Sequence, residues 1–355
     1  MARDVQVNRR SKQNRKLELT QHRRRQRKAA RRLTFLCILL LAMIGVAVYV
    51  FLLRNHDPKL TRTFSKTDPV FGIQKVSLES GLASSMASEL GVVNEDIPLE
   101  DVQLTAGAAA LFSESDRQVL YAKNVHQKMY PASITKIMTT LVALKYGNLD
   151  EVVTVGEECK DIEEGSSVCE IKVGDRLTLR QLLYGLMINS GNDAAMTIAV
   201  HVGGSVENFV SMMNEEAKDI GATNTHFINP HGLQDEEHYT TVYDVYLMFH
   251  EALKYDDFQD MIGKSNYYAT YTDASGEETG IMWESTNHYF INEAIPPEDV
   301  TVVGGKTGTT SEAGACLCLY SKDKYGDPYI SIILNAETKE VLYQEMNELL
   351  SKINK

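Results

Sequence analysis

Ser133-Ile134-Thr135-Lys136 stands at the start of a long apolar run, two residues after Pro131. A proline just ahead of an apolar, periodic run is typical of a helix N-terminus, so we expect Ser133 at or near the beginning of a helix. Lys136 follows three residues later and therefore lies on the same helical face. A serine hydroxyl becomes an effective nucleophile when a neighbouring base removes its proton, and the lysine amine is placed to do so.

Two more short motifs follow in the chain. Ser190-Gly191-Asn192 begins 57 residues after Ser133, and Lys306-Thr307-Gly308 begins 116 residues after Ser190. The first of them follows an apolar helical run, at a break where Ser190 can relay a proton and Asn192 can hold a substrate amide. Alone it would be an ordinary helix cap. Each motif is weak by itself, but chance seldom supplies all three in one chain.

Lys306 supplies the second cation of the expected site. A lysine acts as a base only when its pKa falls, and both burial and a nearby positive charge lower the pKa of Lys136. The Lys306 motif follows an expected strand over residues 300–303 through Gly304 and Gly305. These glycines allow a substrate backbone to lie close against a sheet edge, where Lys306 and Thr307 can bind a carboxylate.

A second S-x-x-K pattern, from Ser321 to Lys324, serves as an internal control. It lies in a polar stretch that includes Gly326 and Pro328, and this composition is typical of a turn. No apolar helical run follows it and no partner motifs accompany it. We therefore interpret it as a chance occurrence in a solvated loop.

Charge divides the chain into two parts. The 355 residues carry a net charge of −12, yet residues 1–32 hold 13 Lys and Arg against Asp4 and Glu18. The next segment, from Leu33 to Leu53, has no charged residue and matches the thickness of a bilayer core. We expect an uncleaved membrane anchor with a cytoplasmic N-terminus and everything after about residue 54 outside. A cleaved secretory signal is the alternative.

The basic tail does not by itself point to nucleic acid. Beside a membrane span, its lysines and arginines are explained by topology and by attraction to anionic lipids. We therefore expect a membrane partner through Leu33 to Leu53 and no nucleic-acid partner.

The remainder divides into a stalk over residues 54–102 and a catalytic domain over residues 103–355. Residues 54–102 show no sustained periodicity and contain scattered prolines. In the domain, period-two patterns predict strands over residues 108–112, 118–121, 300–303, 314–320 and 329–335. Helical patterns cover residues 134–146, 179–188, 194–202, 206–220, 242–254 and 338–353. This order predicts an α+β sandwich, in which an antiparallel sheet joins both ends of the domain and a helical cluster is inserted between them.

Five cysteines are present. Cys37 lies in the expected membrane span. Cys316 and Cys318 lie two apart on an expected strand, so they share a face about 7 Å apart and suit core packing better than a bridge. Cys159 and Cys169 flank an acidic loop in the extracytoplasmic part, where a disulfide is possible and left open. No Cys or His spacing suits a metal site, and we expect no cofactor.

In this order, the three motifs resemble those of the low-molecular-mass penicillin-binding proteins, the serine D-Ala-D-Ala carboxypeptidases. Residues 131–136, 190–194, 224–233 and 305–308 all resemble family blocks in family order. The resemblance spans about residues 105–355. It implies a helical cluster against a five-stranded antiparallel sheet, the penicillin-binding and serine β-lactamase-like fold.

The resemblance also implies the role of each site residue. Ser133 is acylated, Lys136 is the base and Ser190 relays the proton. Substrate-binding positions are Asn192, Lys306, Thr307, Gly308 and Thr309. Among them Lys306 and Thr307 hold the terminal carboxylate, and the N–H groups of Ser133 and Thr309 form the oxyanion hole.

Two further positions follow from the resemblance. His231 matches a family position, and we expect it to be structural. Some family members place an arginine near the start of the last helix to help bind the carboxylate. Here only Lys339 stands in that region, and its contribution is left open.

The implied substrate is a peptidoglycan stem peptide ending in D-Ala-D-Ala, with β-lactams as inhibitors. A serine β-lactamase is an alternative, but no E-x-x-[LN]-N stretch follows Ser190 to activate a deacylating water. A membrane-bound β-lactam sensor is another alternative, although the 32-residue tail holds no recognisable signalling domain.

Overall fold

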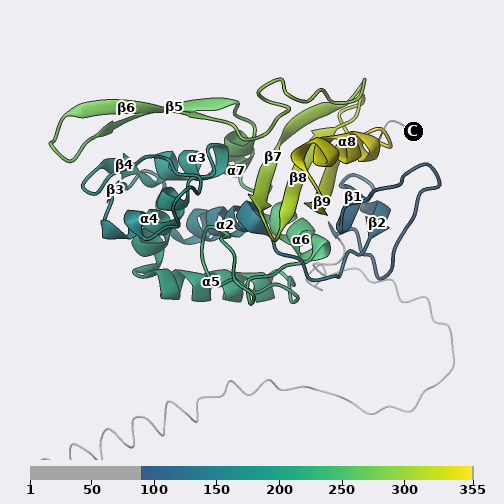
Figure 1. The fold of residues 1–355 in the computed structure, drawn as a ribbon, viewed down its shortest axis with the longest axis horizontal. Coiled ribbons are helices and arrows are strands. Elements are labelled where there is room, and N and C mark those ends of the chain that lie inside the picture. Colours follow the sequence, from purple (N-terminus) through teal and green to yellow (C-terminus); the bar gives the residue numbers. More distant parts are fainter. Residues whose placement is uncertain (1–88, 354–355) are drawn as a thin grey trace, which may run out of the picture. The chain divides into compact units, whose positions relative to one another are not determined.

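Strands from both ends of the domain form one central sheet. In the computed structural model, which describes residues 89–353, this sheet has the order β2-β1-β9-β8-β7, and every neighbouring pair is antiparallel (Figure 1). Its strands are β1 (Ala108–Ser113), β2 (Gln118–Lys123), β7 (Thr301–Thr310), β8 (Gly314–Lys322) and β9 (Pro328–Ala336). The expected α+β sandwich is confirmed.

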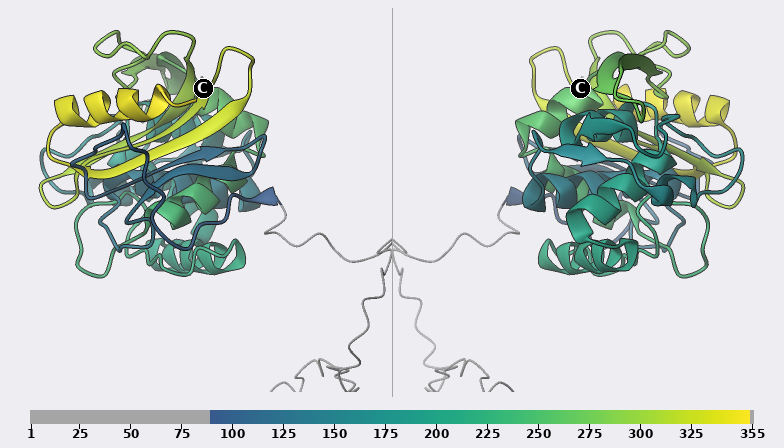
Figure 2. Two further views of the ribbon diagram at one scale, coloured as in Figure 1. Left: turned by 90° about the vertical axis from the view of Figure 1, so that its right-hand side faces the viewer. Right: turned by 90° about the vertical axis from the view of Figure 1, so that its left-hand side faces the viewer.

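Alternation along the strands gives the sheet two apolar faces. On β8, Leu317 and Leu319 pack with α8 (Lys339–Leu350), which lies along one face of the sheet (Figure 2). Cys316 and Cys318 point to the other face, in the core cluster shared with the helices. Both thiols are buried and free, as their spacing predicted. Each face is therefore covered, and the sheet forms the middle layer of a three-layer sandwich.

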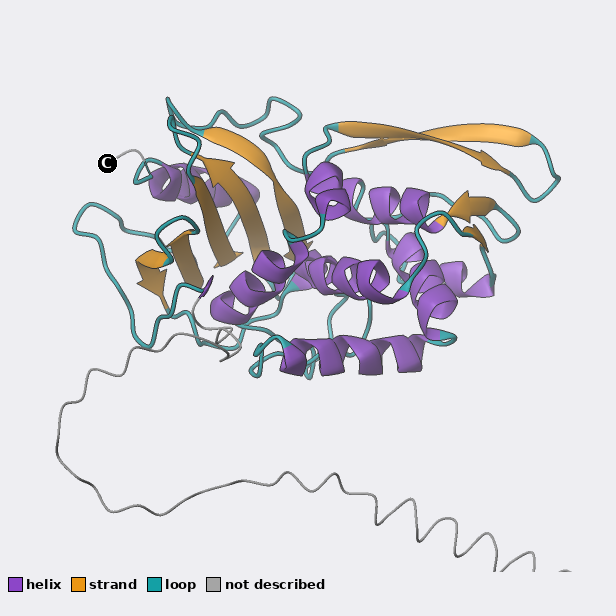
Figure 3. Cartoon of the chain, turned by 180° about the vertical axis from the view of Figure 1, so that it is seen from behind, coloured by secondary structure: helices purple, strands orange, loops and turns teal. Residues whose placement is uncertain are grey.

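The helices between β2 and β7 form one cluster against that second face (Figure 3). They are α2 (Lys136–Tyr146), α3 (Leu179–Ile188), α4 (Asn192–Gly203), α5 (Val206–Asp219), α6 (Val242–Ala252) and α7 (Asp256–Ile262). Helix α2 is buried over its first eight residues and packs against α3, α4, α5 and α6. Because α2 lies at the centre of this cluster, its first turn is held on all sides where it meets the sheet.

A second, four-stranded sheet was not anticipated from the sequence. It has the order β3-β4-β5-β6, with β3 (Val152–Thr154), β4 (Arg176–Thr178), β5 (Asn266–Thr272) and β6 (Glu278–Glu284). The β5–β6 hairpin reaches out over the helices (Figures 1 and 3). Only Ala269 and Trp283 of this hairpin are fully buried. The alternation of apolar and polar residues along these two strands is therefore weak, and no clear strand signal is present in the sequence there.

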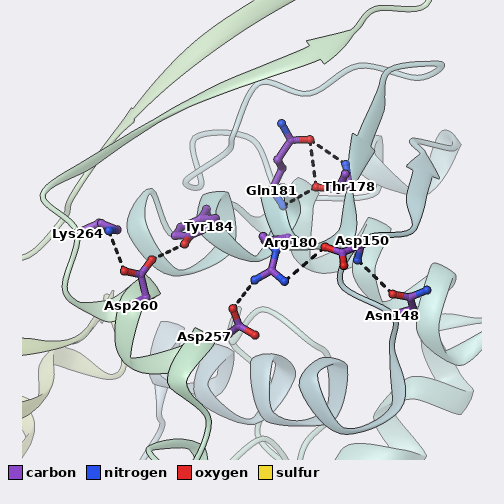
Figure 4. Close-up of polar contacts among 9 residues, drawn as sticks. All are labelled: Asn148, Asp150, Thr178, Arg180, Gln181, Tyr184, Asp257, Asp260 and Lys264. Atoms are coloured by element: carbon purple, nitrogen blue, oxygen red, sulfur yellow. Dashed lines mark hydrogen bonds and ion pairs between the residues drawn. The ribbon is translucent and has the colours of Figure 1, made fainter.

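Polar contacts hold α3, the helix that leads to Ser190 (Figure 4). A reciprocal capping box between Thr178 and Gln181 starts the helix. Arg180 pairs with Asp257 on α7 and lies 3.4 Å from Asp150. Tyr184 donates to Asp260, also on α7, whose other oxygen pairs with Lys264 at 2.8 Å. These contacts hold α3 against α7 and against the loop that precedes β3, which contains Asp150.

The last part of the expected stalk packs on the domain instead. Ile97 pairs with Ala122 of β2, and the Gly91 N–H donates to the Tyr246 hydroxyl on α6 at 3.0 Å. Val93 and Val102 are buried. Within residues 89–353 no helix is both long and apolar enough to span a bilayer. The expected tail, the anchor over residues 33–53 and the stalk up to residue 88 lie outside the described residues.

The expectation that the second S-x-x-K pattern lies in a solvated loop was wrong for Ser321. Ser321 lies within β8 rather than in a solvated loop, and its side chain is fully buried. The expected turn begins only at Asp323. Pairing with Val302 of β7 and Tyr329 of β9 carries the strand through this polar position.

Candidate active site

Ser133 lies within a 3-10 turn that leads directly into a helix. The turn covers Ala132–Thr135, and α2 begins at Lys136, so the expected helix start is preceded by a tighter turn. Ala132 has a φ of 47°, an unfavourable left-handed value for a residue with a side chain. Lys136 Nζ lies 2.8 Å from Ser133 Oγ. The expected pairing of hydroxyl and amine is therefore present.

The Lys136 amine is buried completely and fully hydrogen-bonded. Besides Ser133 Oγ, it contacts Asn192 Oδ1 and the His231 carbonyl oxygen, each at 2.7 Å. Burial, and next the positive charge of Lys306, lower the pKa of Lys136 well below its usual value. A neutral amine can accept the proton of Ser133, so the site favours the protonation state that a base requires.

Ser190 and Lys306 form a second hydroxyl–amine pair. Ser190 sits between α3 and α4 with a φ of 60°, and Lys306 Nζ donates to its Oγ at 3.0 Å. Lys306 is 1% exposed and also donates to the Thr307 carbonyl at 3.0 Å. Burial lowers the pKa of Lys306 to about 7.

The Lys306 motif lies inside a strand, whereas the sequence suggested that the strand ended before a glycine-rich turn. Strand β7 runs from Thr301 to Thr310 and pairs with β8 along this length, apart from a register shift between Val302 and Gly304. It is one of the two edge strands of the sheet, β2 being the other. One side of its backbone therefore remains available to an extended peptide.

Gly308 lets this edge strand approach the nucleophile. A Cβ atom added at Gly308 would lie 3.0 Å from both the Pro131 carbonyl oxygen and the Ser133 nitrogen. Such contacts are tighter than folded proteins normally show, so only glycine fits without movement. Thr309, the next residue on β7, lines the same hollow as Ser133, where the family resemblance places an oxyanion hole made of the N–H groups of these two residues.

Asp193 is a site residue that sequence reasoning missed. Its buried carboxylate accepts hydrogen bonds from the N–H groups of Cys169 at 2.7 Å, Ala194 at 2.8 Å and Ile171 at 3.2 Å. Burial raises the pKa of Asp193 even though these donors favour the charged form. The only sequence signal was its place directly after Asn192. Asp193 ties the segment before α3 to the first turn of α4.

Cys169 lies directly beneath the middle motif. A Cβ atom at Gly191 would fall 2.2 Å from Cys169 Sγ, so glycine is required at that position. Cys159 and Cys169 are both buried free thiols, and the disulfide left open by the sequence is not formed in this structure.

His231 contributes its backbone rather than its ring to Lys136. The ring is buried and accepts a hydrogen bond from the Leu233 N–H at 3.2 Å. Burial lowers the pKa of His231 to about 3, which keeps the ring neutral. Among residues 89–353, no group of three or more His, Cys, Asp and Glu side chains is placed to hold a metal ion.

Two hollows open from Ser133. The first is lined by Ser190, Thr307 and Thr309, together with Thr286, His288, Lys339 and Tyr343. The hydroxyl groups of Thr286 and Thr307 are 2.5 Å apart. The second is lined by Asn192, Thr309, Thr310, His231 and an acidic loop that includes Glu163 and Glu164. Thr286, His288 and the acidic loop carried no motif, and only folding brings them to the cleft.

Every expected catalytic and binding position thus lies in or beside one cleft. The profile of the D-alanyl-D-alanine carboxypeptidase family matches residues 94–338. The chain is 34% identical over 250 residues to the D-alanyl-D-alanine carboxypeptidase DacF of Bacillus subtilis, covering 69% of this chain and 61% of DacF. It is 34% identical over 264 residues to DacC of Escherichia coli, covering 71% of this chain and 62% of DacC.

A solved structure shows the same fold. The Streptomyces K15 DD-transpeptidase superposes with a TM-score of 0.66 at 27% identity, covering 71% of this chain and 98% of that one. The chain spans about three fifths of the length of the curated relatives DacF and DacC. The extent of the profile match, the identities and the shared fold lead to one conclusion: this chain belongs to peptidase family S11, the D-alanyl-D-alanine carboxypeptidases.

Proposed function

We propose that this chain is a serine D,D-carboxypeptidase that removes the terminal D-alanine from peptidoglycan stem pentapeptides through an acyl-enzyme on Ser133. The observation that carries the proposal is the pair of buried lysines. Lys136 Nζ lies 2.8 Å from Ser133 Oγ, and Lys306 Nζ lies 3.0 Å from Ser190 Oγ. Membership of family S11 supports the same reaction.

Acylation begins with proton transfer from the Ser133 hydroxyl to neutral Lys136. Ser133 Oγ then forms a bond to the carbonyl carbon of the penultimate D-alanine. The negative charge that develops on the carbonyl oxygen is stabilised by the N–H groups of Ser133 and Thr309. Asn192, which is hydrogen-bonded to Lys136 at 2.7 Å, orients the peptide amide above the nucleophile.

The leaving group departs toward the first hollow. Its carboxylate pairs with protonated Lys306 and the Thr307 hydroxyl. As the C–N bond breaks, Ser190 gives its hydroxyl proton to the leaving amine and takes up the proton that Lys136 removed from Ser133, so that Lys136 is neutral again. A water molecule then attacks the ester, releases the shortened peptide and restores the Ser133 hydroxyl. Lys339 lines the same hollow and adds positive charge near the carboxylate.

A β-lactam presents a similar carboxylate and carbonyl. It therefore acylates Ser133, but its amine stays attached and blocks the leaving-group side. We propose that its ester is hydrolysed slowly, as expected of a penicillin-binding protein and not of a β-lactamase.

We further propose that the chain is a single-pass membrane protein. The charge-free segment from Leu33 to Leu53 forms the anchor, residues 1–32 stay in the cytoplasm, and the catalytic domain lies outside. Protease added to intact cells should then cut between the anchor and the domain and release an active enzyme. Recovery of a protein that starts after residue 53, without added protease, would show a cleaved signal instead.

The reaction itself is tested by incubating the full-length chain with a stem pentapeptide and with benzylpenicillin. We expect D-alanine release from the pentapeptide, no release when its terminal carboxylate is amidated, and an acyl-penicillin adduct that lasts minutes or longer. Rapid penicillin hydrolysis without D-alanine release would favour a β-lactamase. Acylation without turnover of either compound would favour a β-lactam sensor.

A further inference from the structure

His238 is a buried histidine that contacts the turn carrying the nucleophile. It lies in the loop between α5 and α6, and it is 2% exposed. Its Nε2 atom is 2.8 Å from the hydroxyl oxygen of Thr135, which is buried within the S-x-x-K motif. Neither residue lines the two hollows that open from Ser133. Any effect of His238 on the reaction must therefore pass through other residues.

The contacts of His238 determine the direction of each hydrogen bond at this turn. The Ile228 N–H donates to His238 Nδ1 at 3.2 Å, so Nδ1 carries a lone pair. Burial lowers the pKa of His238 to about 4, and in the neutral ring the proton is then on Nε2. Nε2 therefore donates to the Thr135 hydroxyl oxygen, and that hydroxyl donates to the Ala132 carbonyl oxygen at 2.8 Å.

The Ala132 carbonyl belongs to the same peptide unit as the Ser133 N–H. That unit is planar and trans, so a contact that holds the carbonyl oxygen also sets the direction of the N–H. Ala132 has a φ of 47°, a conformation that persists only when the surrounding structure holds it. Gly232 lies against the same oxygen, because a Cβ atom added there would be 1.8 Å from it. Thr135 and Gly232 together therefore restrict the orientation of this peptide unit.

We infer that His238 is a positioning residue for the oxyanion hole, and that it acts through Thr135 on the peptide unit joining Ala132 to Ser133. Because Nε2–H donates to Thr135, the hydroxyl proton of Thr135 is directed to the Ala132 carbonyl. Hydrogen bonds in such a chain polarise one another, so the Ser133 N–H is both oriented and made a stronger donor. This inference rests on the proposed function and on the oxyanion hole that the family resemblance implies.

The test measures acylation of the full-length chain by benzylpenicillin and the infrared spectrum of the acyl-enzyme. Thr135→Val and His238→Leu each remove one link of the chain. We expect each to slow acylation about tenfold, a part of the roughly 10²- to 10³-fold loss that follows removal of a whole oxyanion donor. The ester carbonyl, identified by a ¹³C label, should absorb at higher wavenumber in both variants, because weaker hydrogen bonds reach its oxygen.

Three further variants separate positioning from general stability. His238→Gln keeps an N–H donor for Thr135 and should acylate within about threefold of the original rate. The double variant of Thr135→Val and His238→Leu should be no slower than Thr135→Val alone, because both residues act in one chain. Thr139→Val is the matched control, since its buried hydroxyl on α2 donates to the Pro230 carbonyl of the same loop at 2.6 Å. It should keep both the rate and the carbonyl band, and thermal unfolding of every variant reports its folding.

The outcomes distinguish this inference from the proposed function. An unchanged acylation rate in Thr135→Val and His238→Leu, or a slower rate with an unshifted carbonyl band, would overturn the positioning role while the carboxypeptidase function stands. An equal loss of rate in Thr139→Val would do the same. Failure of the unmodified chain to form an acyl-enzyme and to release D-alanine from a stem pentapeptide would instead overturn the proposed function.

Discussion

Replacing Lys306 with alanine removes the charge that the proposed mechanism assigns to carboxylate binding. Lys306 Nζ donates to Ser190 Oγ and to the Thr307 carbonyl, each at 3.0 Å. Losing a charge-assisted contact to the substrate costs about 2–3 kcal/mol, and leaving Ser190 without its donor costs about 1 kcal/mol more. We therefore expect a loss of kcat/KM on the order of 10²- to 10³-fold for D-alanine release.

The pH profile of the same variant tests the electrostatic reasoning. The charge of Lys306 lowers the pKa of Lys136, so removing it lets that pKa rise. Lys136 acts as a base only when neutral, and the acid limb of kcat/KM should therefore move to higher pH. In the unmodified chain, Lys306 loses its charge as the pH rises through about 7, which weakens carboxylate binding. That alkaline limb should disappear in the variant.

A matched control is Lys254→Ala. Lys254 is a surface lysine just after the end of α6, and it is paired with Glu251 in the last turn of that helix. The kcat/KM of this variant should stay within about twofold of the original, since exposed ion pairs contribute little. A loss below threefold for Lys306→Ala, or an acid limb that does not move, would refute the assigned role of Lys306.

Three other substitutions probe the surroundings of the site. Gly308→Ala should slow acylation by penicillin at least tenfold, because its Cβ would meet the Ser133 nitrogen at 3.0 Å; stopped-flow kinetics equal to the original would contradict this. Asp193→Ala leaves three buried N–H donors without an acceptor and should lower the free energy of unfolding, measured in urea, by about 3 kcal/mol. A decrease below about 1 kcal/mol would be inconsistent with the observed contacts. Ser321→Ala removes a buried hydroxyl that has no hydrogen-bond partner among the described residues, so thermal unfolding should show equal or slightly higher stability, with D-alanine release unchanged.

Elements with strong apolar periodicity were predictable from the sequence. The expected helix over residues 179–188 coincides with α3, and the expected strands over residues 108–112 and 329–335 match β1 and β9 within two residues at each end. These segments bury one or both faces, so their own side chains carry the pattern. The gathering of the three motifs in one cleft was expected from their complementary chemistry and from the family resemblance, not from any local periodicity.

Other features depend on contacts between distant segments. Strand β7 continues through Gly304, Gly305 and Gly308 because β8 pairs with it, although glycine disfavours strands. Beyond its place directly after Asn192, Asp193 carries no local signal, because its carboxylate is bonded by N–H groups of Cys169 and Ile171 that only folding brings to α4. The β5–β6 hairpin was missed because few of its side chains are buried.

The identity of the nucleophile is the central claim, and mapping a penicillin adduct tests it most directly. The full-length chain is labelled with benzylpenicillin, digested and analysed by mass spectrometry. We expect the adduct on Ser133, none on a Ser133→Ala variant that remains folded by circular dichroism, and normal labelling of Ser321→Ala, which alters the other S-x-x-K pattern. An adduct on another residue, or full labelling of Ser133→Ala, would contradict the account.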